Sequence, residues 1–431
     1  YYTIYTMTTM RSFAGLALGL LVLFCLFVDV GGSQMNNVIS SFGKIDYSSD
    51  TLVLRSFAGS HYFLNMDAKT IAELFDMSFA WPSDAEKIRQ VHQIRPDFKA
   101  LLVRNIRAIY YTRPDEWEMA MKNNWLLKDE KGQLVYVTIY PNSYLVDIGN
   151  TSYQVWVANW IKEHVDQYGY DGVFADYSLN VVASGYFWQT SAKPINPRTG
   201  FPWTNEEIKQ ALIQVHMEIK KAIGSKLLVS NGISMGSKFW KNYAEYLEVF
   251  SNSPLDGLMS EELWYQEQGF WMTEENWLKS LDFLIFLQEN FLNRMPWKVF
   301  VPTLKLESFD GKQDPLPTGA TKKQMAVYAL ASTLLGIKTS QNYLCINVDV
   351  NFTAQVVHPL YEIVVSTPLS DYYMVNGTHV YARDFSNVKV LVNPTSSSYS
   401  IDLRSAFKTL DGKIITDVIM EAHTGMILMK V

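Results

Sequence analysis

The sequence predicts an α/β protein, a (β/α)8 TIM barrel followed by a small C-terminal antiparallel β domain. Between about residues 50 and 365, short apolar runs alternate with amphipathic segments, which is the pattern of βα units around a parallel sheet. Eight apolar runs lie in these roughly 315 residues, a length within the usual size range of a barrel. After about residue 370 the runs shorten, alternate with polar residues and are separated by turn residues.

The clearest βα unit starts with a helix over residues 151–168. Apolar residues recur there at helical spacing, and Gly169 stands where a C-terminal cap is expected. Asp171 and Gly172 then turn the chain into a short buried strand, Val173–Ala175. Helix, cap, turn and strand follow one another as a βα repeat requires.

The other units have the same pattern. Thr204 and Glu207 have the spacing of a capping box, and they predict a helix that ends near Gly224. Two more helices are expected over residues 273–293 and 321–336. The remaining strands are expected at His61–Leu64, Met77–Ala80, Ala100–Val103, Leu227–Val229, Gly257–Ser260, Lys298–Val301 and Tyr343–Ile346.

A doubly wound open sheet is the alternative architecture. That fold places a glycine-rich phosphate loop after a strand, and no G-x-G-x-x-G sequence follows any of the expected strands. We therefore favour the barrel. Residues 106–150 are then expected to be an elaborated loop after the third strand, held down by Trp117 and Trp125.

The C-terminal region predicts a packing module, with carbohydrate binding as the alternative role. Asn-Gly, Asn-Pro and Asp-Gly pairs separate its short alternating strands. These strands are expected at Tyr372–Met374, His379–Tyr381, Val388–Val392, Ser400–Leu403, Lys413–Thr416 and Met426–Val431. The domain boundaries that we expect are residues 1–33 for an N-terminal segment, 34–368 for the barrel and 369–431 for the β domain.

The N-terminal segment predicts export. Residues 13–28 form an uncharged apolar run of sixteen residues, with Arg11 before it and Asp29 after it. This is slightly longer than the core of a signal peptide, about 7–15 residues, and shorter than the about 20 residues that span a bilayer. A cleaved signal peptide and an uncleaved anchor both fit, so we expect a secreted or cell-surface protein. Any contact with a membrane is expected only through such an anchor.

Composition excludes several functional classes. The net charge is −6, which provides no basic surface for a nucleic acid. The seven histidines include no H-E-x-x-H pair, and Cys345 is the only cysteine after the N-terminal segment. We therefore expect neither a metal site nor a cofactor, and no disulfide within one chain. The oligomeric state stays open.

Two segments of the chain share one frame that ends in an acid. Residues 171–176 and 256–261 both contain Asp-Gly, three residues that are mostly apolar, and then Asp176 or Glu261. Each acid thus comes at the C-terminal end of a strand, where barrel enzymes carry their chemistry. Equal spacing also gives both side chains the same orientation, because strand residues alternate faces.

A pair of carboxylates at one site is what cleavage of a glycosidic bond requires. One acid protonates the leaving oxygen, and the other attacks the sugar or activates water. We assign Asp176 as nucleophile or charge stabiliser and Glu261 as general acid/base. Glu262 is the alternative to Glu261, which we favour because it shares the frame of Asp176.

Residues that could hold a sugar follow the expected strands or close the long loop. Sugars are bound by aromatic faces together with fixed polar groups, and both kinds are present. The predicted substrate-binding residues are Trp81, Arg104 (with its neighbour Asn105), Tyr140, Asp147, Asn231, Trp264, Lys305 and Asn347.

One competing motif points to a serine hydrolase. Residues 232–236 match G-x-S-x-G around Ser234 and follow a strand. No clear helix follows this motif and no oxyanion loop is recognisable, so the carboxylate pair is the stronger candidate.

The chain resembles the hypothetical glycosyl hydrolase 15 family of glycoside hydrolases. The motifs that carry the resemblance are residues 144–150, 171–176, 256–261, 380–385 and 390–394. The resemblance implies a TIM barrel with a small C-terminal β domain. The related endo-α-1,4-polygalactosaminidase-like barrels place an Asp after strand four and a Glu after strand six, which implies these roles for Asp176 and Glu261.

The sequence thus predicts an exported glycoside hydrolase that acts on a polysaccharide or glycan. A surface-attached protein that binds glycans without cleaving them, with the same barrel, is the alternative from another class. A glycosyltransferring enzyme of the same architecture is the second alternative.

Overall fold

The structure is a computed structural model, and it describes most of the chain after residue 53. The described ranges are 54–59, 66–137, 140–178, 193–233, 235–264, 270–292, 298–306, 316–339, 342–347, 356–361, 363, 365–366 and 368–431. The expected N-terminal segment (residues 1–33) and the expected strand His61–Leu64 lie outside these ranges, as does Ser234. None of the helices within these ranges is long and apolar enough to cross a membrane.

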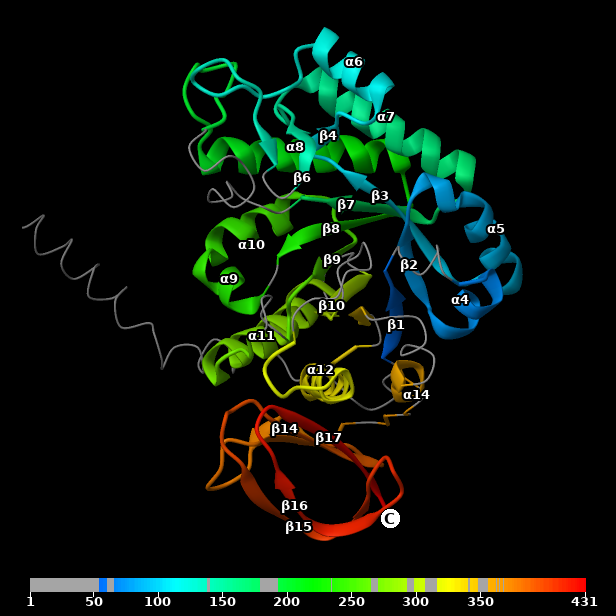
Figure 1. Cartoon of the computed structure of the whole chain (residues 1–431), viewed down its shortest axis with the longest axis vertical. Coiled ribbons are helices and arrows are strands. Elements are labelled where there is room, and N and C mark those ends of the chain that lie inside the picture. Colours follow the sequence, from blue (N-terminus) through cyan, green and yellow to red (C-terminus); the bar gives the residue numbers. More distant parts are fainter. Residues whose placement is uncertain are drawn as a thin grey trace, which may run out of the picture. The chain divides into compact units, whose positions relative to one another are not determined.

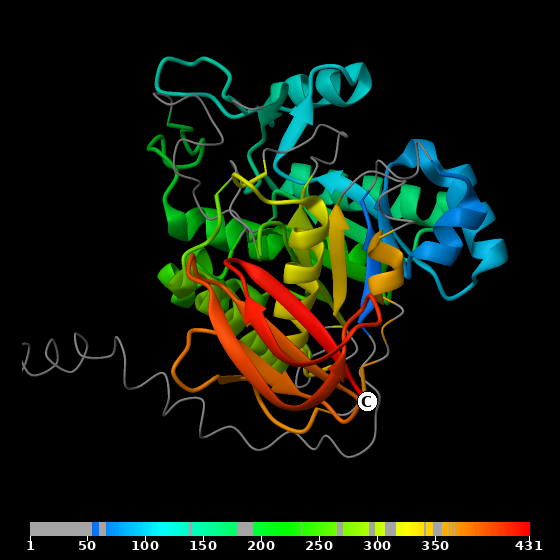
Figure 2. The same ribbon diagram turned by 60° about the horizontal axis from the view of Figure 1, so that its bottom comes forward.

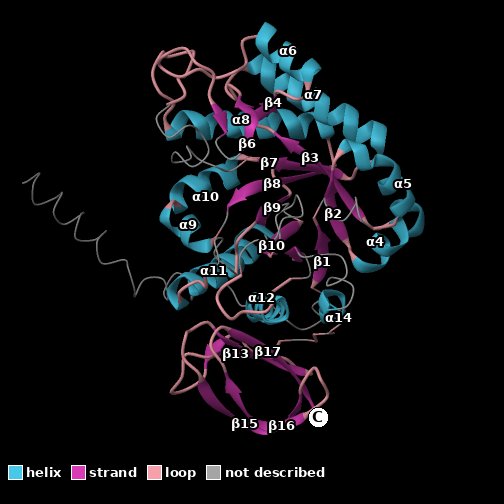
Figure 3. Ribbon diagram, in the orientation of Figure 1, coloured by secondary structure: helices cyan, strands magenta, loops and turns pink. Residues whose placement is uncertain are grey.

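Eight parallel strands close into a barrel with helices around it, which confirms the predicted fold class (Figures 1 and 3). The order around the barrel is β1-β11-β10-β9-β8-β7-β3-β2. These strands are β1 Arg55–Ala58, β2 Met77–Ala80, β3 Lys99–Asn105, β7 Gly172–Asp176, β8 Leu227–Ile233, β9 Gly257–Ser260, β10 Val299–Lys305 and β11 Tyr343–Asn347.

The first barrel strand differs from the expected one. It is β1, and it pairs with both β2 and β11, whereas we expected the more aromatic run at His61–Leu64. Only Phe57 and Ala58 supply apolar side chains to β1, one to each side of the barrel wall. Such a short run is a weak signal in a sequence, although two neighbouring strands cover its whole length.

The helices begin and end at the predicted signals. Helix α7 (Thr151–Tyr168) ends at Gly169, whose φ of 74° is left-handed. Helix α8 (Asn205–Ile223) has the capping box between Thr204 and Glu207. Outside the segment that follows β3, the other helices are α4 Ala68–Leu74, α5 Ala85–Ile94, α9 Gly236–Lys241, α10 Tyr243–Asn252, α11 Glu274–Leu287, α12 Lys322–Gly336 and α14 His358–Tyr361, with the short turns η1 Pro82–Asp84 and η2 Gln288–Leu292.

Alternation along the strands separates an inner from an outer layer of side chains. Leu101 and Val103 of β3 and Phe174 of β7 belong to the cluster that fills the barrel. Their neighbours Leu102 and Ala175 belong to the outer core beneath the helices. Because the side chains alternate, this pattern decides which residue at each strand's C-terminal end faces the barrel axis.

The expected loop after the third strand is folded into a small subdomain. Strands β4 (Ala108–Tyr110), β5 (Tyr136–Val137) and β6 (Tyr140–Leu145) form an antiparallel sheet with β6 in the middle. Helix α6 (Pro114–Lys122) lies in the same segment. Trp125 fastens it to α7, because its ring packs on Tyr153 and its Nε1 donates to Ser152 Oγ at 2.7 Å.

The C-terminal strands form a six-stranded antiparallel sheet that packs on α12 (Figure 2). Arg383 is buried at this contact and donates to the Leu334, Leu335 and Ile337 carbonyls at the end of α12. It thereby satisfies carbonyls that a helix end leaves unpaired. The strands are β12 Tyr373–Met374, β13 Tyr381–Asp384, β14 Val388–Asn393, β15 Tyr399–Lys408, β16 Ile414–Met420 and β17 Thr424–Lys430.

The repeated Asp-Gly pairs fix the N-terminal ends of two barrel strands. The Asp171 carboxylate accepts from the Ala100 backbone N–H at 2.9 Å, and Asp256 accepts from the Leu228 N–H at 2.9 Å. Each carboxylate therefore fastens its own strand to a preceding one. The following glycine is needed because a Cβ on Gly172 or Gly257 would lie 2.2 Å from a carbonyl oxygen of the next strand.

We predict that Gly172→Ala and Gly257→Ala each lower the free energy of unfolding by at least about 2 kcal/mol, because a backbone carbonyl cannot move aside as a side chain can. Denaturant unfolding measures the effect. Gly132→Ala is the control: its φ is 76°, but a Cβ there has open space, so it should cost only about 1 kcal/mol. Equal losses in all three variants would contradict the steric explanation.

Candidate active site

Inward-facing polar residues gather at the C-terminal ends of the barrel strands. Asn105, Asp176 and Asn231 each come two residues after a side chain that fills the barrel, and Lys305 comes four residues after Val301, which also fills it. In the strand register, Asn105 lies opposite Asp176. Glu261 follows β9 directly, two residues after inward-facing Met259. The matched frames therefore bring both predicted acids to one end of the barrel.

A single amide nitrogen joins the two acids. Asn231 Nδ2 donates to Asp176 Oδ1 at 2.9 Å and to Glu261 Oε1 at 2.7 Å. These two oxygens can be no farther apart than the sum of those distances, 5.6 Å. Because the two N–H bonds of an amide diverge by about 120°, the separation is roughly 5 Å. The bridge reaches Glu261, the member of the Glu261/Glu262 pair that we favour.

The backbone after Asp176 is held in an uncommon conformation. Tyr177 has a φ of 58°, and its N–H donates to Asp176 Oδ1 at 2.9 Å. The next residue, Ser178, donates its N–H to the Asn231 carbonyl at 3.0 Å. Left-handed backbone at a residue other than glycine costs energy and persists only where the surroundings enforce it. The same turn thus orients both Asp176 and Asn231.

A buried network behind the strands enforces this turn. Ser178 Oγ lies 2.5 Å from both His216 Nε2 and Ser230 Oγ. On its other side, His216 Nδ1 lies 2.9 Å from Ser253 Oγ. Burial lowers the pKa of His216 to about 3, so the ring is neutral and joins the serines as a donor and an acceptor. Sequence analysis did not find this network, because its members are scattered over residues 178–253.

Burial and the neighbouring charge of Glu261 raise the pKa of Asp176 to about 6. Three groups act in the opposite direction: the amide of Asn231, the N–H of Tyr177 and the positive charge of Lys305. The negative charge of a second carboxylate so close makes Asp176 harder to ionise than an isolated carboxyl group. One protonated and one ionised carboxyl is the state that acid-assisted nucleophilic chemistry requires.

The structure contradicts the prediction that Arg104 binds substrate. Arg104 is 2% exposed and faces outward, and its guanidinium forms two hydrogen bonds to Glu116, at 3.0 and 2.9 Å. It also lies 4.3 Å from the Trp160 ring centre. Its neighbour Asn105 holds the inward position instead. The alternation along β3 settles this choice, since Asn105 and not Arg104 shares a face with Val103.

Asp147 and Trp264 also have structural roles. Asp147 is buried, and both of its carboxylate oxygens accept from Arg198, the shortest distance being 2.9 Å. Trp264 is fully buried, and its Nε1 donates to Thr333 Oγ1 on α12 at 2.9 Å. Neither side chain is available to a sugar in this arrangement, so both predictions are wrong.

The remaining predicted residues are placed as follows. Asn231 and Lys305 lie beside the acids as expected. Trp81 is partly buried at the end of β2 and packs on the cluster inside the barrel. The side chains of Tyr140 and Asn347 lie outside what the structure describes, although Asn347 pairs with Lys305 in the strand register. In the described part of the chain, no three His, Cys, Asp or Glu residues are grouped to hold a metal ion.

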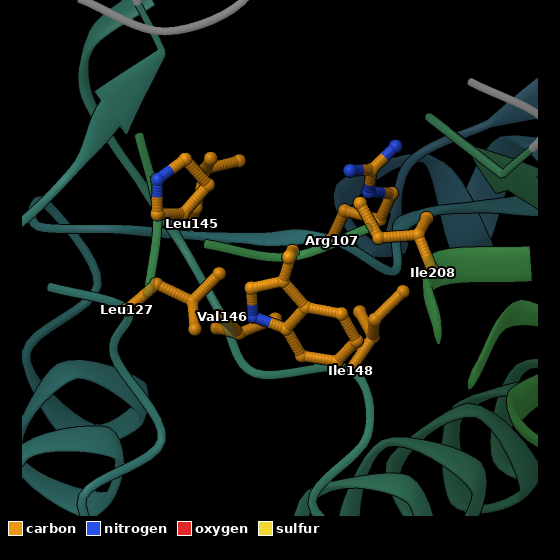
Figure 4. A pocket seen from close by; sticks show the side chains of 8 residues that line it. Arg107, Leu127, Leu145, Val146, Ile148 and Ile208 are labelled. Carbon is orange, nitrogen blue, oxygen red and sulfur yellow. The ribbon is translucent and has the colours of Figure 1, made fainter. Parts of the chain in front are cut away.

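A small pocket has neither acid in its lining (Figure 4). It is lined mainly by apolar side chains of the subdomain after β3, together with Arg107, Trp203 and Ile208. It has room for about one water molecule, so it cannot hold a sugar. The candidate site is therefore the group of residues around the Asn231 bridge.

Solved structures share this architecture. An alpha-amylase from Lactobacillus plantarum aligns with a TM-score of 0.51 and 11% identity, covering 88% of this chain and 97% of that chain. A maltogenic alpha-amylase from Thermotoga neapolitana aligns with a TM-score of 0.49 and 10% identity, covering 88% of this chain and 98% of that chain. At such identities the similarity concerns the fold alone. A comparison with curated proteins finds no match.

A family model extends the comparison to the sequence itself. The model described as hypothetical glycosyl hydrolase family 15 matches residues 92–389. The match runs from α5 through every later barrel strand into β14, and it includes Asp176, Asn231 and Glu261. Because it covers well over half of the sequence, the chain belongs to the hypothetical glycosyl hydrolase family 15 and is a glycoside hydrolase.

Proposed function

We propose that this glycoside hydrolase retains the anomeric configuration of its substrate, with Asp176 as nucleophile and Glu261 as general acid/base. The observation that carries the proposal is the amide of Asn231, which donates to both carboxylates. In retaining enzymes the two carboxyl groups are about 5–5.5 Å apart, and in inverting enzymes they are about 6.5–9.5 Å apart. The limit of 5.6 Å between the bridged oxygens supports retention.

The surroundings of the two acids support these roles. Both hydrogen bonds to Asp176 end on Oδ1, from Tyr177 and Asn231, and no described residue donates to Oδ2. Lys305 favours the ionised form of Asp176, as a nucleophile requires. Glu261 has a longer side chain and lies beyond the end of its strand, where it can follow the leaving oxygen.

The reaction then follows in two displacements. Asp176 Oδ2 attacks the anomeric carbon, the glycosidic C–O bond breaks, and Glu261 gives its proton to the leaving oxygen. In the second step Glu261 takes a proton from a water molecule, whose oxygen attacks the anomeric carbon and releases Asp176. If the hydroxyl group of a second sugar took the place of that water, the same chain would be a transglycosylase. This is the second candidate function, and its products distinguish it.

The proposal places the substrate, a polysaccharide or glycan, outside the cytoplasm. The uncharged apolar run at residues 13–28 supports export. The bridged carboxylates argue against a protein that only binds glycans, since binding needs no pair of acids held close enough for one to raise the other's pKa.

We predict that Asp176→Asn and Glu261→Gln each lower kcat/KM on a cleaved glycan by about 10³-fold or more, because each removes a group that forms or breaks a bond. Aryl glycosides separate the roles. A dinitrophenyl leaving group needs no proton, so Glu261→Gln should form the glycosyl-enzyme from it at a near-normal rate, whereas Asp176→Asn should not.

Glu262→Gln is the matched control, and its rate should stay within about threefold of the wild-type rate. An active wild type that keeps its rate in both Asp176→Asn and Glu261→Gln would contradict the proposed pair. A product of inverted configuration, seen by NMR during hydrolysis, would contradict retention alone.

We predict that kcat/KM rises as the pH rises through about 6. Asp176 attacks the anomeric carbon only when it is ionised, and its pKa is raised to about 6, so the fraction of free enzyme with an ionised nucleophile grows through this pH. A kcat/KM that does not rise between about pH 5 and about pH 6 would contradict a nucleophile with this raised pKa.

A further inference from the structure

Three polar side chains, Tyr110, Asn105 and Ser143, meet near Asp176, and the sequence predicts only Asn105 among them. Tyr110 ends strand β4 and pairs with Ser143 of β6. Asn105 lies opposite Asp176 at the end of β3. The negative charge of Asp176 acts on the Tyr110 hydroxyl, so the folded segment after β3 places this tyrosine near the proposed nucleophile.

The orientation of the Asn105 amide is fixed by its oxygen. Oδ1 accepts from the backbone N–H groups of Arg107 at 3.0 Å and Ala108 at 2.9 Å. Only an oxygen can accept these bonds, so Nδ2 points away from the turn and acts as a donor. Asn105 is 6% exposed, and Nδ2 has no partner within hydrogen-bond distance among the residues described.

Ser143 is in the same situation. It is fully buried, and its Oγ lacks a partner within hydrogen-bond distance in the described part of the chain. A buried polar group that forms no hydrogen bond costs about 1–3 kcal/mol, and such groups concentrate at functional sites. Asn105 and Ser143 are two such groups on separate strands, and both affect the pKa of one hydroxyl group, that of Tyr110.

The Tyr110 hydroxyl is neutral and has a proton to donate. Burial and the negative charge of Asp176 raise the pKa of Tyr110, although Asn105 and Ser143 act to lower it. Asn105 and Ser143 lower the pKa of Tyr110 as donors to the phenolic oxygen do, although neither lies within hydrogen-bond distance in the free enzyme, so the phenolic hydrogen is left for a third group. Hydrogen bonds of this kind are often long in a free enzyme and shorten when substrate binds.

We propose that Tyr110 binds substrate by donating a hydrogen bond to the hydroxyl group at C2 of the sugar whose anomeric carbon reacts with Asp176. Asn105 and Ser143 are positioning residues that hold the phenolic oxygen. This inference rests on the proposed function. C2 is the substituted ring carbon adjacent to the reacting one, so a group that lies beside the nucleophile is closest to its substituent.

The proposal names a class of substrate. A donor at this position suits a neutral sugar with a free C2 hydroxyl, which can accept the bond. A 2-amino-2-deoxy sugar presents an ammonium group there, which only donates and finds no acceptor on Tyr110. Hydrogen bonds to the C2 hydroxyl strengthen in the transition state, so the loss of the bond from Tyr110 should lower mainly kcat.

The test compares Tyr110→Phe with Tyr111→Phe on an aryl glycoside that the wild type cleaves and on its 2-deoxy and 2-amino-2-deoxy analogues. Tyr111 is the matched control, since it is the next residue, is 58% exposed and packs its ring on Trp117. Tyr110→Phe should lower kcat/KM on the parent glycoside by about tenfold to hundredfold and leave the 2-deoxy analogue within about twofold. The wild type should cleave the 2-amino analogue at least about tenfold more slowly than the parent, and Tyr110→Phe should narrow this difference.

Ser143→Ala gives a second measurement that leaves Tyr110 in place. It should lower the rate on the parent glycoside more than on the 2-deoxy analogue, which a general loss of stability would not do. Equal losses on both substrates in Tyr110→Phe, or no loss, would overturn this inference while the proposed function stands. A wild type that cleaves no glycoside would instead overturn the proposed function.

Discussion

The site depends on one constraint, which is that a single amide nitrogen holds two carboxylates that repel each other. Asn231 donates one hydrogen to Asp176 and one to Glu261, and this fixes the distance between the bridged oxygens of the two acids. The pair is costly, because burial and like charge raise the pKa of Asp176 to about 6. The barrel and the buried His216 network supply the rigidity that keeps this arrangement in place.

The barrel positions the acids through alternation along its strands. One set of side chains fills the barrel, and the next inward position on each strand is the first that can be polar. Asn105, Asp176 and Asn231 occupy these positions on three strands, Lys305 lies one inward position farther along β10, beyond Thr303, and Glu261 follows β9. The Asp-Gly pairs at the other end of β7 and β9 fix where each strand begins. The equal spacing then places each acid at the C-terminal end of its strand.

Local signals made the fold and the acid pair predictable, whereas the surroundings of the pair depend on tertiary contacts. Helix caps such as Gly169, and the repeated frames of residues 171–176 and 256–261, depend only on residues that are close together in the sequence. Arg104 and Trp264 were misassigned because an arginine or tryptophan after a strand looks the same in a sequence whether it faces the barrel axis or the helices. The alternation along β3 could have shown that Asn105, and not Arg104, faces the barrel axis. Nothing local could have joined Ser178 to His216, or Tyr110 to Ser143, since each pair meets only in the folded chain.

The electrostatic coupling of the two acids is the central claim, and it can be measured without a substrate. Carbon-13 NMR of the labelled carboxyl groups would follow Asp176 through a pH titration in the wild type and in Glu261→Gln. We expect Asp176 to titrate near pH 6 in the wild type and clearly lower in the variant, because the negative charge that opposes its ionisation is gone. An Asp176 that titrates at the same pH in both proteins would show that the carboxylates do not act as a pair.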